Sequence, residues 1–86
     1  MNTNLPRKKI RDWRQDRLLT LGELAALVGV KLQTIWNWEQ DRSQPEFRNM
    51  RALAKALGVE PQQIIMPDAD EIEAARERRR SKKIAA

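Results

Sequence analysis

The chain has 86 residues, which suits one small domain built around a single hydrophobic core. It contains no cysteine and no histidine, which excludes a disulfide framework, a thiolate metal site and the usual general base. The net charge of +5 is unevenly placed, because residues 1–17 carry six basic and two acidic side chains. This excess suits a polyanionic partner, although a solvated, solubilising end would have the same composition.

The start of the chain is polar and lacks the apolar segment of a signal peptide, and no apolar run approaches membrane-spanning length. The acidic residues read as capping, pairing and turn positions, and no nucleophile is accompanied by a base. The glycine motifs that cradle phosphate groups are also absent. We therefore expect a soluble cytoplasmic protein that is not an enzyme, uses no cofactor or metal, and has no membrane partner.

Apolar residues recur every three or four positions, which predicts helices and no strand. Thr20 and Glu23 have the spacing of a capping box, so a helix should begin at Leu21. Gly29 and Gly58 should end two of the helices, because glycine readily adopts the left-handed conformation. The expected fold is all-α, a compact five-helix domain. Its helices are expected at about 8–17, 21–28, 32–40, 47–57 and 61–65.

Two apolar stretches follow the third predicted helix. The first is a stripe in the fourth helix, made of Phe47, Met50, Leu53, Ala54 and Leu57. The second is Ile64–Met66, expected on a short helix of which one face cannot bury all three side chains. Part of that surface, extended by Ile72, is a candidate dimer patch. The alternative is that the C-terminal tail folds over it.

The composition changes at Asp68, where acidic residues come first and arginines and lysines come last. This order matches the helix dipole, and Glu73/Arg76 and Glu77/Arg80 are favourable pairs three residues apart. Apolar residues are too few for a core-facing stripe, so we expect a marginal helix that a partner could order. The predicted organisation is a basic arm over residues 1–9, a folded domain over 10–66 and a charged tail over 67–86.

The segment from Thr20 to Glu39 places two short helices on either side of Gly29. Small Ala25 allows the second of these helices to approach the first closely, and Gly29 allows an abrupt end to the first. Two helices that meet steeply, with polar residues on the outer face of the second, are typical of a protein that inserts a helix into the DNA major groove.

The pattern of apolar and small residues in this segment resembles the helix-turn-helix of phage repressors and Cro proteins, the xenobiotic-response-element family. The residues that carry the resemblance are Leu24, Ala25, Val28–Val30, Ile35 and Trp38. Further motifs in family register are Trp13-Arg14, Leu19-Thr20, Trp38-Glu39 and the sequence LAKALGV at Leu53–Val59. The resemblance covers about residues 10–65, most of the chain.

The resemblance implies that the third helix enters the major groove and that its N-terminal half reads base edges. Gln33 and Asn37 lie four residues apart on one helix face, and their amides match the donor and acceptor of adenine. We predict that both read bases; the alternative is that they are solvated polar residues. Leu32 either contacts a thymine methyl or covers the turn. Trp36 should point away from the core, toward DNA or toward a protein interface.

The resemblance also implies phosphate contacts at the start of the second helix and on both sides of the third. The predicted phosphate contacts are Thr20, the backbone N–H of Leu21, Lys31, Arg42 and Ser43. Two residues depart from the family pattern. Leu21 stands where relatives often have glutamine, and Asp41 replaces a frequent glycine and adds negative charge. The arm at Arg7–Lys9 either follows the DNA or is simply solvated.

In the resembling family, an arginine of the first helix commonly pairs with the glutamate that ends the third helix. The corresponding residues here are Arg14 and Glu39. We predict that they form a structural ion pair that ties the first helix to the recognition helix.

The function expected from the resemblance is sequence-specific binding of double-stranded DNA by a small transcriptional regulator, a repressor in the simplest case. One recognition helix reads few base pairs, so we expect a homodimer on an operator with two half-sites. The alternative is an antitoxin-type interaction module, in which the tail binds a partner protein while the helix-turn-helix regulates its own operon. A nucleoid-associated location follows from DNA binding.

Overall fold

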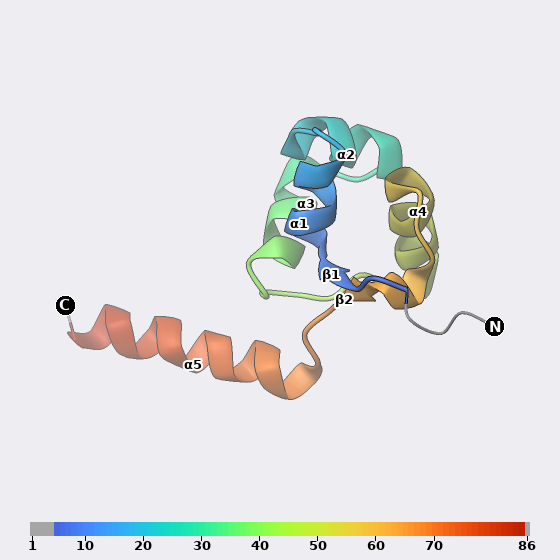
Figure 1. Ribbon diagram of the computed structural model, residues 1–86. Coiled ribbons are helices and arrows are strands. Elements are labelled where there is room, and N and C mark those ends of the chain that lie inside the picture. The colour runs from blue at the N-terminus through green and yellow to red at the C-terminus, as the bar shows by residue number, and fades with distance from the viewer. Residues whose placement is uncertain (1–4, 86) are drawn as a thin grey trace.

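Four helices surround one apolar core, and a fifth projects from it (Figure 1). A computed structural model describes residues 5–85, with side chains described as far as residue 80. The helices are α1 (Ile10–Asp16), α2 (Leu21–Val28), α3 (Leu32–Glu39), α4 (Phe47–Leu57) and α5 (Ala69–Ala85). The prediction of an all-α fold with a repressor-like helical arrangement is confirmed.

The ends of α2 and α4 follow from local sequence. The backbone N–H of Glu23 donates to Thr20 Oγ1 at 3.0 Å, and the Thr20 N–H donates to Glu23 Oε1 at 2.8 Å, so the predicted capping box is present. Gly29 has φ +90° and Gly58 has φ +73°, the left-handed conformation that glycine adopts without a Cβ clash. Each glycine stops its helix and turns the chain toward the next element.

The core lies between α1, α2, α3 and α4, and it is closed at one end by the segment that follows α4. Ala25 is buried at the contact between α2 and α3, as expected for a residue that lets two helices approach closely. The other buried core residues are Ile10, Trp13, Leu24, Ile35, Trp38, Leu53, Ala54, Leu57 and Ile64. This single cluster fixes the orientation of α3 from its inner side.

Two short strands replace helical segments that the sequence analysis expected. Lys8–Lys9 form β1 and Ile64–Ile65 form β2, which pair in parallel with Lys8 opposite Ile64. The first helix is therefore shorter than expected, and the predicted helix at 61–65 is only a 3₁₀ turn, Pro61–Gln63, before β2. The prediction of no strand was wrong because this pairing joins segments 56 residues apart, and two-residue strands have no visible alternation.

Two apolar predictions also need correction. Phe47 is the first residue of α4 and its side chain is 90% exposed, so the apolar stripe of α4 begins at Met50. Ile64–Met66 is not a helical surface: Ile64 is buried in the core, Met66 packs against the core, and Ile65 is exposed because side chains alternate along a strand. Of these three residues only Ile65 is exposed, and Ile72, the predicted extension of the dimer patch, is half-buried.

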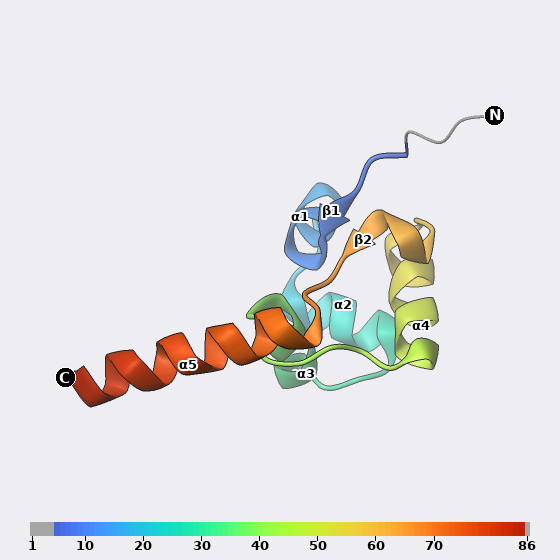
Figure 2. The same cartoon turned by 90° about the horizontal axis from the view of Figure 1, so that it is seen from below.

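The tail forms α5, which leaves the body and extends well beyond it (Figures 1 and 2). Its attachment lies near its start, where Ala75 is buried, Ile72 is half-buried, and the Gln44 amide donates to the carbonyl of Pro67. The two predicted charge pairs are present, at 3.6 Å for Glu73–Arg76 and 3.1 Å for Glu77–Arg80. Across residues 5–85, no helix is both long enough and apolar enough to cross a membrane.

Replacement of Leu18 by glycine should stabilise the fold. Leu18 has φ +57° and is 89% exposed. Its left-handed backbone conformation therefore costs free energy that no core contact offsets. Relief of that conformation is worth about 1 kcal/mol in the free energy of unfolding, measured by chemical denaturation. Leu27→Gly is the matched control, because Leu27 is also exposed but lies within α2, where glycine should destabilise by a similar amount. A destabilised Leu18→Gly variant would contradict this account.

Candidate nucleic-acid interface

The α2–turn–α3 unit is held from within by the core and joined by a tight turn. Leu24 and Ala25 of α2 and Ile35 and Trp38 of α3 are buried in the same cluster. The backbone N–H groups of Gly29 and Val30 both donate to the carbonyl of Ala25, at 2.8 and 3.0 Å, so the chain reverses direction immediately after α2. The inner face of α3 is thereby fixed, and its outer face is left to polar residues.

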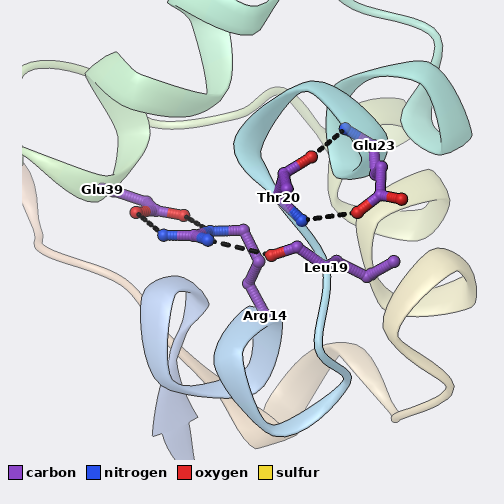
Figure 3. Close-up of polar contacts among 5 residues, drawn as sticks. All are labelled: Arg14, Leu19, Thr20, Glu23 and Glu39. Carbon is purple, nitrogen blue, oxygen red and sulfur yellow. Dashed lines mark hydrogen bonds and ion pairs between the residues drawn. The ribbon is translucent and has the colours of Figure 1, made fainter.

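A bidentate ion pair ties α3 to the beginning of the chain (Figure 3). Arg14 Nε donates to Glu39 Oε2 at 2.6 Å, and Arg14 Nη2 donates to Glu39 Oε1 at 3.1 Å. Arg14 Nη1 also donates to the carbonyl oxygen of Leu19 at 3.0 Å, one residue before the N-cap of α2. A single guanidinium thus joins α1, the start of α2 and the end of α3.

The Arg14–Glu39 pair is largely withdrawn from water. The exposed fraction is 13% for the Arg14 side chain and 3% for that of Glu39. The hydrogen bonds to Glu39 raise the pKa of the Arg14 guanidinium above its ordinary value, against the opposing effect of burial. A raised pKa favours the charged form, and its stabilisation would be lost only as the pH rises through that value. The Arg14 guanidinium therefore stays charged throughout the physiological range.

The outer face of α3 carries two neighbouring amides. Gln33 is exposed and Asn37 is half-buried, and Gln33 Nε2 donates to Asn37 Oδ1 at 3.2 Å. This bond occupies one N–H of Gln33 and leaves its carbonyl oxygen, its second N–H and the NH₂ group of Asn37 without a partner in that pair. The two predicted base-reading residues are thus linked on one face, with donors and acceptors still available.

Leu32 and Trp36 flank the two amides in different ways. Leu32 is 49% exposed, and its side chain lies beside Gly22 at the start of α2, so it contacts α2 and still presents an apolar surface. Trp36 is half-buried, and the guanidinium of Arg42 lies 4.9 Å from its ring centroid. Stacking against Arg42 explains how the Trp36 ring can lie outside the core.

The residues predicted to contact phosphates lie at the ends of α2 and α3. Thr20 precedes the first N–H groups of α2, which have no partner within a helix, and Lys31 precedes α3. Arg42 and Ser43 follow α3, and the Arg42 N–H donates to the Asn37 carbonyl at 2.9 Å. Asp41 has φ +57°, a left-handed backbone conformation. Glycine adopts this conformation most readily, and aspartate is one of the few other residues that tolerate it.

The side chain of Leu21 packs against the core. At this position only the backbone N–H is available to a phosphate.

Arg42 lies beside the tail, a proximity that was not predicted from the sequence. Arg76, Arg79 and Arg80 of α5 line an open hollow together with Arg42. The spacing of the three tail arginines, at i, i+3 and i+4, indicates that they share a helix face. Their position beside Arg42 could not be inferred, because it depends on the path of residues 66–69.

Two short helices lie on either side of the turn at Gly29. The second is held by the Arg14–Glu39 pair and carries amides on its outer face, an arrangement that defines a helix-turn-helix protein. The helix-turn-helix family model matches residues 10–64, more than half of the chain. The chain therefore belongs to the helix-turn-helix family of the phage repressor and Cro type, a family of DNA-binding proteins rather than enzymes. Repressor protein C2 of Salmonella phage P22 is similar, with 32% identity over 75 residues.

That alignment covers 87% of this chain but 35% of the P22 protein. The chain thus spans about a third of the length of the curated relative that it matches.

Removal of the Arg14 side chain should destabilise the protein strongly. Arg14→Ala leaves the buried Glu39 carboxylate without its partner, which typically costs about 3–5 kcal/mol in the free energy of unfolding. Arg14→Lys should recover only part of the loss, because lysine cannot donate in the same bidentate geometry. Chemical denaturation measures these differences.

Arg11→Ala is the matched control, since Arg11 is an exposed arginine of the same helix and its loss should have little effect. The double variant Arg14→Met/Glu39→Leu removes both charges and should be more stable than Arg14→Ala. Equal stability of wild type and Arg14→Ala would contradict a structural role for the pair.

Proposed function

We propose that the protein is a transcriptional repressor that binds double-stranded DNA in a sequence-specific manner. Helix α3 lies in the major groove, and two copies bind two half-sites of one operator. The observation that carries this proposal is the hydrogen-bonded pair of Gln33 and Asn37 on the outer face of α3, whose inner face is buried in the core. The name of the P22 relative, a repressor protein, supports the regulatory role.

The base-reading role follows from the geometry of the two amides. The Gln33 carbonyl oxygen accepts from the adenine N6 amino group, while its free N–H donates to N7. The bond between Gln33 and Asn37 restrains both side chains before DNA arrives, which lowers the entropy lost on binding. The NH₂ of Asn37 then contacts an adjacent base, and the exposed part of Leu32 contacts a thymine methyl.

Phosphate contacts at both ends of α3 and at the start of α2 hold the reading helix in register. Thr20 and the Leu21 N–H bind one stretch of backbone at the positive end of the α2 dipole. Lys31, Arg42 and Ser43 bind on either side of α3. Trp36 contributes by fixing the guanidinium of Arg42 over its ring, close to the groove edge.

A homodimer provides the second half of the recognition. One helix of eight residues reads only a few base pairs, so two copies on half-sites about 34 Å apart are needed for a specific operator. Ile65 remains the exposed member of the apolar segment that follows α4, and it is the first residue to examine at a contact between copies.

Selection of bound sequences from a random duplex pool tests both the readout and the dimer. Wild type should enrich an inverted repeat, since a two-fold dimer reads each half-site in the same way. Gln33→Ala should lose discrimination at one position of each half-site, because a bidentate amide–adenine contact is worth about 1–3 kcal/mol. The information content of the enriched motif at that position is the measured quantity.

Gln40→Ala is the matched control, since Gln40 is an exposed glutamine immediately after α3 and should leave the motif unchanged. Enrichment of nothing by the wild-type protein would contradict specific binding. An unaltered motif for Gln33→Ala would exclude Gln33 as a reader, and a motif without a repeat would contradict the dimer.

A further inference from the structure

A cluster of arginines lies between the loop after α3 and the side of α5. Arg42, Arg76, Arg79 and Arg80 line one open hollow of about 560 Å³, and the lining residues among those whose side chains are described are all arginines. Four guanidinium groups around one space repel each other unless an anion lies between them. The hollow is therefore suited to anionic groups that accept several hydrogen bonds.

The charge in this hollow is available to a ligand. Arg76 and Arg80 pair with Glu73 and Glu77 on their own helix, but all four side chains are between 55% and 59% exposed. Ion pairs of this kind contribute little to stability and can be exchanged for a stronger anionic partner. Arg79 is half-buried, and it makes no ion pair with any side chain in the described range that ends at residue 80.

The hollow lies next to the reading face of α3. The backbone N–H of Arg42 donates to the carbonyl of Asn37, and the Arg42 guanidinium stacks on Trp36. On the other side, Arg76, Arg79 and Arg80 place α5 beside Arg42, and Ala75 of the same helix is buried. Figures 1 and 2 both show α5 running away from the body toward the C-terminus.

We propose that this hollow binds phosphate groups of the DNA backbone that flank the groove entered by α3, so that α5 extends the footprint beyond the helix-turn-helix. The inference rests on the proposed DNA-binding function and adds residues of the tail to it. Guanidinium groups suit phosphates because they donate two parallel hydrogen bonds in a fixed plane. A duplex is favoured over an acidic protein because the same continuous molecule then reaches both α3 and Arg42.

The test compares two adjacent arginines of α5 in the full chain. Arg79 lines the hollow, whereas Arg78 is exposed elsewhere on the helix surface. Arg79→Gln and Arg78→Gln remove the same charge from the same helical turn, so any difference between them reports a local contact. Fluorescence anisotropy with a labelled mixed-sequence duplex, several helical turns long, gives the dissociation constant at a series of salt concentrations.

The slope of log affinity against log salt should become shallower by about 0.9 for Arg79→Gln, which is the loss of one phosphate contact on B-form DNA. Arg78→Gln should keep the wild-type slope, and Arg79→Lys should restore most of it because the charge is retained. Thermal melting of each variant, followed by circular dichroism, shows whether the fold is intact.

Equal slopes for wild type, Arg79→Gln and Arg78→Gln would overturn the proposal and would favour a protein partner for α5. Equal losses for the two glutamine variants would also overturn it, because only the net charge would then matter. Failure of the wild-type protein to bind any duplex would contradict the proposed function itself. Binding with unchanged slopes would contradict the α5 contact alone.

Discussion

The bidentate pair between Arg14 and Glu39 is the interaction on which the placement of α3 depends. An isolated helix of eight residues is marginal in water, so α3 exists because other elements hold it. The core fixes its inner side through Ile35 and Trp38, and Arg14 fixes its C-terminal end while also binding the Leu19 carbonyl at the start of α2. A rotation of α3 that moved its amides would have to break a buried charge pair.

This constraint divides α3 into two sets of residues with separate tasks. Ile35, Trp38 and Glu39 face the body and specify where the helix lies. Gln33 and Asn37 lie outside the core cluster and bond to each other, so they can change without disturbing the core. The loop after α3 and the basic side of α5 are proposed to add phosphate contacts, which would increase affinity but carry no base information.

The sequence predicted the parts of this structure that local chemistry determines. Gly29, Gly58 and the Thr20–Glu23 capping box ended and began helices where expected, since each effect acts within a few residues. Family register gave the positions of Arg14 and Glu39, which form a bidentate pair, although nothing in the local pattern requires residues 25 apart to meet. The outward position of Gln33 followed from helical periodicity and the turn at Gly29.

Features that depend on long-range placement were missed. The β1–β2 pair joins Lys8–Lys9 to Ile64–Ile65, and isoleucines expected on a helix instead alternate between core and solvent. Periodicity also extended the apolar stripe of α4 to Phe47, whose position at the helix start lies beyond the edge of the core. The arginine hollow depends on where the chain after Pro67 directs α5, which no local signal gives.

The most direct test of the account is a ¹⁵N–¹H NMR titration of the protein with a duplex that it selects. The side-chain NH₂ resonances of Gln33 and Asn37 report directly on the groups that are proposed to read bases. The account predicts that both shift on binding, together with backbone amides of α3 and of the start of α2, while the core amides of α4 stay in place. Side-chain amide resonances of Gln33 and Asn37 that remain unchanged in the saturated complex would contradict it.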